Sequence, residues 1–108
     1  MDTVKVLGQS NPAATTLTSL YTVPAATTAT ISSLTVCNQG AAAATFRVSV
    51  RVAGAADTPK QYIYYSLNIN SFDTFVATLG ITLSAADVVS VYASSASLSF
   101  NLFGVELT

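Results

Sequence analysis

Hydrophobic residues alternate with threonine and serine along most of the chain, and their period is two rather than the 3.6 of an amphipathic helix. The clearest example is the segment 46–52. There Phe46 and the following valines share one face, while Arg47, Ser49 and Arg51 share the other. This alternation predicts a half-buried β-strand. No segment of the chain has the pattern of an amphipathic helix.

Seven further segments predict strands by the same pattern, and turn residues such as Asn38-Gln39-Gly40 separate them. The loop 53–60 follows segment 46–52. Gly80 is expected to interrupt the chain after the predicted strand 72–79. Together the eight predicted strands cover residues 4–7, 17–23, 29–37, 46–52, 61–69, 72–79, 88–93 and 98–107. About eight short strands without helices predict one all-β domain over residues 1–108, an antiparallel β-sandwich with a jelly-roll-like topology. The strand order stays open.

The last predicted strand changes the parity of its apolar positions. Leu98, Phe100 and Leu102 share one face, whereas the apolar residues from Phe103 onward have the opposite parity. The change occurs beside Gly104, and glycine inside a strand often marks a β-bulge. We therefore expect a bulge there that turns the later residues, Phe103, Val105 and Leu107, back toward the core.

Charge is scarce in this chain, and that limits its partners. Charged residues make up 8% of the sequence, hydrophobic residues 51%, and the net charge is −1. Nothing here neutralises a row of phosphates, so we expect no nucleic-acid partner. The longest apolar run is only 41–44, far below the ~20 residues of a membrane-spanning helix, so we expect no membrane partner. A surface with so little charge favours burial in an assembly.

The N-terminal sequence Met1-Asp2-Thr3 has an acidic residue where a secretory signal carries positive charge, and no apolar segment follows. We therefore expect the chain to be made and used without export.

The inventory of reactive side chains is too thin for an enzyme. The chain contains no histidine and one cysteine, Cys37, so a Cys/His metal site and an internal disulfide are excluded. A serine nucleophile would need Lys5 or Lys60 as its base. The three aspartates 57, 73 and 87 lie in or beside predicted turns, without the clustered spacing of a calcium loop. We expect no catalytic residue, no cofactor and no metal.

Four residues are candidates for an interface. In segment 61–69, Ile63, Tyr65, Leu67 and Ile69 have one parity, and Tyr62 and Tyr64 have the other. The two tyrosines would then face solvent, as Arg47 and Arg51 do on their own strand. Tyrosine and arginine are enriched at protein interfaces. The alternative is that these side chains only cover a sheet face or pair across strands.

The segment Leu20-Tyr21-Thr22-Val23-Pro24, the Thr-rich strand after it and the turn Asn38-Gln39-Gly40 form a longer pattern. This pattern resembles one that recurs in small virion structural proteins of tailed phages. The segments 45–51 and 98–104 also fit, and the resemblance spans about residues 17 to 107.

The resemblance implies a β-sandwich virion component without catalytic residues. We expect a capsid decoration or cement protein, a homotrimer that is made in the host cytoplasm. It would bind the major capsid protein on the outer capsid surface and stabilise the shell. The alternative is a tail or baseplate module of the phage, with contact to host glycans as one of its roles.

Overall fold

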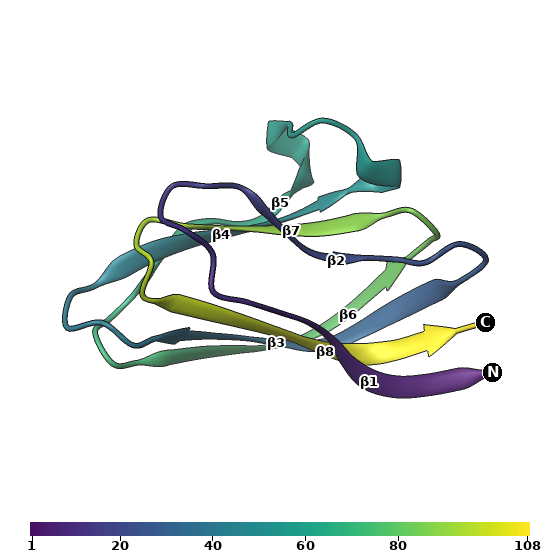
Figure 1. Cartoon of the computed structure of the whole chain (residues 1–108), viewed down its shortest axis with the longest axis horizontal. Coiled ribbons are helices and arrows are strands. Elements are labelled where there is room, and N and C mark those ends of the chain that lie inside the picture. The colour runs from purple at the N-terminus through teal and green to yellow at the C-terminus, as the bar shows by residue number, and fades with distance from the viewer.

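The computed structural model describes all 108 residues and contains eight β-strands in two layers (Figure 1). It contains no helix with the length and apolarity that a membrane-spanning helix requires. Two short 3₁₀ turns, η1 (Val52–Gly54) and η2 (Pro59–Gln61), lie between the fourth and fifth strands. The strands are β1 (Asp2–Ser10), β2 (Thr18–Thr22), β3 (Thr28–Asn38), β4 (Ala44–Arg51), β5 (Tyr62–Ile69), β6 (Thr74–Leu83), β7 (Val88–Ala93) and β8 (Leu98–Leu107).

The strands form two antiparallel sheets of four strands, with the orders β1-β8-β3-β6 and β2-β7-β4-β5. Each strand of the first half of the chain pairs with one of the second half: β1 with β8, β2 with β7, β3 with β6 and β4 with β5. These nested pairs are those of a long hairpin rolled into two layers, which is the jelly-roll arrangement. The predicted eight-stranded antiparallel sandwich is therefore confirmed.

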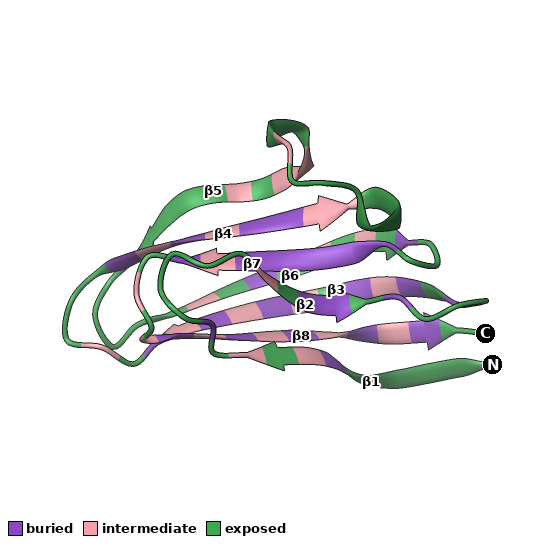
Figure 2. Cartoon of the chain, turned by 45° about the horizontal axis from the view of Figure 1, so that its top comes forward, coloured by how far each residue is buried: buried purple, intermediate pink, exposed green.

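The core lies between the two sheets, where the inward-facing apolar side chains of both meet. Phe46 on β4 and Phe100 on β8 are fully buried, and their ring centroids lie 6.1 Å apart across the layers. Figure 2 shows that β7 is buried over most of its length, whereas β1 and β5, at the sheet edges, are largely exposed. The predicted core face of β4 is confirmed for Phe46 and Val48. Val52, by contrast, is exposed, because β4 ends at Arg51 and Val52 already belongs to η1.

The predicted bulge beside Gly104 is wrong. β8 alternates without interruption, and the three residues that were expected to return to the core point outward: Phe103, Val105 and Leu107. The register shifts lie in the two neighbouring strands instead, at Leu7 of β1 and at Ser32 of β3. Gly104 points inward, where the carbonyl of Thr30 and the side chain of Leu7 approach it so closely that no Cβ would fit.

Gly80 does not interrupt its strand. β6 continues through it to Leu83, and the register against β3 shifts at this point, where the residues between Thr78 and Ile81 lie opposite Ser32. The glycine therefore marks a bulge rather than a strand end.

Candidate functional site

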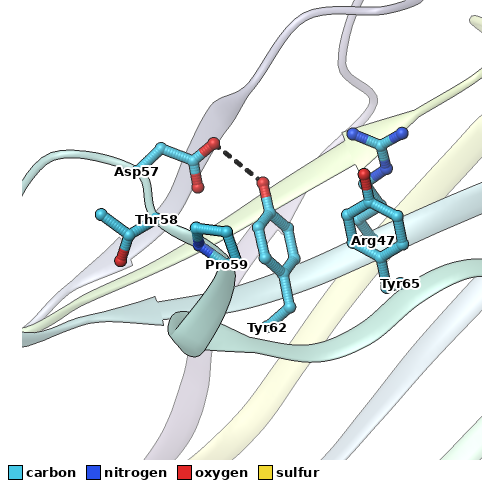
Figure 3. Close-up of a pocket in the computed structure, with 6 residues that line it drawn as sticks. All are labelled: Arg47, Asp57, Thr58, Pro59, Tyr62 and Tyr65. Carbon is cyan, nitrogen blue, oxygen red and sulfur yellow. Dashed lines mark hydrogen bonds between the residues drawn. The ribbon is translucent and has the colours of Figure 1, made fainter.

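A pocket of about 510 Å³ opens on the outer face of the sheet β2-β7-β4-β5. One wall comes from the segment between β4 and β5, which projects from the body of the sandwich (Figure 1). The floor comes from outward-facing side chains of the sheet. Six residues line the pocket: Arg47, Asp57, Thr58, Pro59, Tyr62 and Tyr65 (Figure 3).

Arg47 is held between two aromatic rings. Its Cζ atom lies 4.2 Å from the ring centre of Tyr65 on β5 and 4.5 Å from that of Tyr92 on β7, the strands on either side of β4. Such contacts stabilise a guanidinium and restrict its movement. Its Nε donates a hydrogen bond of 3.2 Å to Oγ of Ser66. The terminal amino groups make no hydrogen bond within the chain, and the single ion pair of the structure joins Lys5 and Glu106. The outer edge of Arg47 is therefore unpartnered.

Two bulges in β5 place Tyr65 next to Arg47. The register shifts once opposite Arg47, where Tyr65 and Ser66 together face one residue of β4, and again between Val48 and Ser49. Ser66 takes a positive φ of 53° at the first bulge. The bulges reverse the expected parity of this part of the strand.

The second pair in the pocket is Tyr62 with Asp57. The phenol of Tyr62 donates a hydrogen bond of 2.9 Å to Oδ2 of Asp57. Its ring stands edge to face against that of Tyr65, with centroids 5.1 Å apart. Partial burial has the largest effect on the pKa of Tyr62, and the hydrogen bond to the Asp57 carboxylate acts in the same direction. Both raise the pKa above its usual value of 10.0, so the phenol remains a hydrogen-bond donor at neutral pH.

The wall of the pocket is built by a turn around η2. The Gln61 side chain closes this turn: its Oε1 accepts from the backbone N–H of Thr58 at 2.9 Å, and its Nε2 donates to the carbonyl of Ala56 at 2.9 Å. Pro59 begins the 3₁₀ turn, where its missing N–H costs nothing. The hydroxyl of Thr58 is buried and has no hydrogen-bond partner. This oxygen lies inside the wall and is closed off from solvent.

Of the four residues predicted for an interface, Arg47 and Tyr62 meet in this pocket, but Tyr64 does not. The second bulge turns Tyr64 inward, so its expected outward position is wrong. Its ring packs against the core, with centroids 6.1 Å from Phe46 and 5.3 Å from Phe75.

Arg51 lies on the same outer face as Arg47, but its guanidinium is already occupied within the chain. It donates to Oγ of Ser90 at 2.9 Å, to the carbonyl of Ala55 at 3.2 Å and to Oγ of Ser19 at 3.3 Å. These bonds join β4 to β7, β2 and the pocket loop. Arg51 therefore holds the sheet and loop together.

Sequence reasoning missed Tyr65, Tyr92 and Asp57 as members of this site. Tyr92 could have been placed on the outer face by its parity in β7, but its direct pairing with Arg47 requires the strand order. Tyr65 was assigned to the opposite face because the bulges of β5 contain no glycine or proline to mark them.

The outer face of the other sheet carries no charge at its centre. Two rows of paired residues cross β1, β8, β3 and β6 there: Val4-Val105-Thr30-Thr82 and Val6-Phe103-Ser33-Thr78. Val4 is 86% exposed and Val6 46% exposed. We call these two rows the apolar face.

No protein-family model matches the chain, and no curated protein matches it.

Proposed function

We propose that this protein is a virion structural protein, a capsid decoration or cement protein that binds the outer surface of a phage capsid and stabilises the shell. The apolar face is the observation that supports this proposal. Contiguous exposed apolar residues on a small domain favour contact with another protein surface. A decoration protein has such contacts on two sides, one with its own copies and one with the major capsid protein.

Self-association, with a homotrimer as the expected state, follows from the same surface. In a closed ring of three copies each contact is heterologous, with one side of this face against the opposite side of the next copy's face, and a face without charge can be buried there without leaving an ion unpaired. Val4, Val6, Phe103 and Val105 supply apolar area, and the threonines beside them supply hydroxyls that can pair or reach solvent at the rim.

The free edge of β6 is a second surface that can contact another subunit. β6 is ten residues long, pairs with β3 alone and contains neither a charged residue nor a proline. The other edge strands are less open: β1 carries Asp2 and Lys5, β2 has five residues, and β5 has two bulges where β6 has the one at Gly80. Long, uncharged edges pair readily with another chain. The edge of β6 therefore lies open to a neighbouring subunit.

The proposal is tested by the oligomeric state of the purified protein and by its binding to particles that lack it. Native mass spectrometry is expected to find a trimer, and the trimer is expected to rebind depleted capsids. Val6→Lys puts a charge in the apolar face and is expected to yield monomers that no longer rebind. The matched control is Val52→Lys, because Val52 is 67% exposed in η1, away from this face. A protein that stays monomeric at high concentration and ignores depleted particles contradicts the proposal.

A tail or baseplate module is the second candidate, and the tyrosine-lined pocket is the observation that favours it, because tyrosines can stack on host glycans. The two roles differ in copy number, with hundreds of copies expected on a shell and on the order of ten in a tail ring. A protein stain of purified particles separates them. A band that rivals the major coat protein supports the decoration role, and a faint band supports the tail role.

A further inference from the structure

We propose that the pocket between the sheet β2-β7-β4-β5 and the β4–β5 loop binds a sugar that carries a carboxylate, a uronic acid unit, with Arg47 as the residue that pairs with the carboxylate. This inference goes beyond the proposed structural role and holds for a subunit on the capsid or on the tail. It rests on the contacts of five lining residues.

The first step is the free guanidinium edge of Arg47. Two tyrosine rings and the hydrogen bond to Ser66 hold the group in place, and neither terminal amino group is used by the protein. A planar guanidinium offers two parallel N–H groups that match the two oxygens of a carboxylate. Because the protein has already ordered this side chain, little conformational entropy is lost when a ligand binds.

The second step is the size and lining of the pocket. A volume of about 510 Å³ lies within the range of small-molecule sites and is sufficient for a pyranose ring. Tyr62, Tyr65 and Pro59 offer apolar surfaces to the C–H groups of a ring. Asp57 offers carboxylate oxygens for its hydroxyl groups. Figure 3 shows Tyr62 between the turn that carries Asp57 and the pair Arg47–Tyr65.

The third step concerns Asp57, whose charge favours a carboxylated sugar over phosphate groups and polyanions as the ligand. Its carboxylate is engaged by the Tyr62 phenol and forms no ion pair with Arg47. The negative charge of Asp57 offsets the positive charge of Arg47, so the pocket attracts phosphate groups and polyanions less than a purely cationic site would. A sugar tolerates it, because its hydroxyl groups can donate hydrogen bonds to Asp57 while its own carboxylate lies at Arg47.

The test is a titration of the full-length protein, followed by the backbone amide signals in NMR spectra. The probes are methyl β-D-glucuronide, methyl β-D-glucoside and acetate, which separate the carboxylated sugar from its neutral counterpart and from a bare carboxylate. We expect saturable shifts at the pocket residues with the glucuronide at millimolar concentration, and affinities at least about tenfold lower for the other two probes.

The variants separate Arg47 from general charge. Arg47→Gln is expected to lower the glucuronide affinity at least about tenfold, and Arg47→Lys, which keeps the charge without the planar fork, is expected to fall in between. Lys60→Gln is the matched control: it removes a positive charge from the pocket loop at an exposed residue outside the lining, and the affinity is expected to stay unchanged. Unchanged amide signals outside the pocket show that each variant folds.

Three results would overturn the inference: no saturable shift up to ~50 mM glucuronide, equal binding of the glucoside, or undiminished binding by Arg47→Gln. None of these results bears on the trimer or on capsid rebinding, so this inference and the proposed function fail separately.

Discussion

The phenol of Tyr21 on β2 donates a hydrogen bond of 2.6 Å to Oε2 of Glu106 on β8, and this buried contact joins the two sheets. On the other oxygen, Glu106 accepts from Nζ of Lys5 at 3.3 Å. The bond from Tyr21 and the Lys5 ammonium together lower the pKa of Glu106 below its ordinary value of about 4.5, against the opposing effect of burial. Burial and the nearby carboxylate raise the pKa of Tyr21, so its proton stays in place.

This pair gives the free energy of unfolding a defined pH dependence. Because the pKa of Glu106 is lowered on folding, its stabilising effect is fully present above pH ~4.5 and is lost as the pH falls through the lowered value. Tyr21→Phe removes the main cause. We expect the variant to be less stable than the native protein at pH 7, with the difference shrinking below pH ~4.5 in urea unfolding measured from pH 7 to pH 2.

The control for that experiment is Tyr92→Phe, because the Tyr92 phenol makes no hydrogen bond within the chain and its ring still covers Arg47. Its stability difference is expected to stay the same at every pH. A Tyr21→Phe difference that does not depend on pH would contradict the role given to Glu106.

Substitution by alanine is expected to change the free energy of unfolding in opposite directions at two glycines. A Cβ at Gly104 would collide with the carbonyl of Thr30 and with Leu7, so Gly104→Ala is expected to cost about 3 kcal/mol or more. A Cβ at Gly80 meets no atom within 4 Å, and Gly80→Ala is expected to stabilise by up to ~0.5 kcal/mol. Denaturant midpoints of the two variants measure this contrast, and equal midpoints would contradict it.

Asn38 is expected to be the most sensitive amide side chain. It is 1% exposed, and the two N–H groups of its Nδ2 are shared among three carbonyls within hydrogen-bond distance, those of Ala42, Ile69 and Asn70. Its Oδ1 accepts from the backbone of Gly40 and from Ser97, both at 2.9 Å. Asn38→Ala leaves these groups without a partner and is expected to cost about 3–5 kcal/mol.

Asn68 serves as the matched amide, since it is exposed and makes one side-chain contact, to Asn70. Asn68→Ala is expected to change the free energy of unfolding by less than ~0.5 kcal/mol. Thermal unfolding of the two variants gives the comparison. Similar losses of stability in both would contradict the importance given to the hydrogen bonds of Asn38.

Cys37 is expected to be dispensable. It lies partly buried on the outer side of β3, opposite Ser99 of β8 and Thr74 of β6, and outside the core. Cys37→Ala is expected to lower stability by less than ~1 kcal/mol and to leave the oligomeric state unchanged. Loss of assembly in this variant, seen by native mass spectrometry, would show that the thiol has a role.

The alternation of apolar and polar residues is a local signal, and it predicted all eight strands and the sandwich. It failed where the cause lies in a neighbouring strand. The parity change near Gly104 looked like a bulge in β8, but the extra residues sit in β1 and β3, opposite an unbroken strand.

Only part of the candidate site could be predicted, because a local pattern does not show which strands are neighbours. Arg47 and Tyr62 stood out by residue type and parity. Tyr65 and Tyr92 reach Arg47 only because β5 and β7 flank β4 and because β5 bulges beside it. Neither fact is encoded in a local pattern.

The nested pairing of the strands has a consequence for how fast the chain can fold. The innermost pair, β4 with β5, closes a short loop, whereas the outermost pair joins Asp2 to Leu107. Closing long loops costs entropy before their contacts form, so the innermost hairpin is favoured as the first structure and the β1–β8 pair as the last. Until that last pair forms, one edge of β8 has unpaired backbone groups. The partly folded sheet then has a second free edge, like the one that β6 keeps in the folded protein.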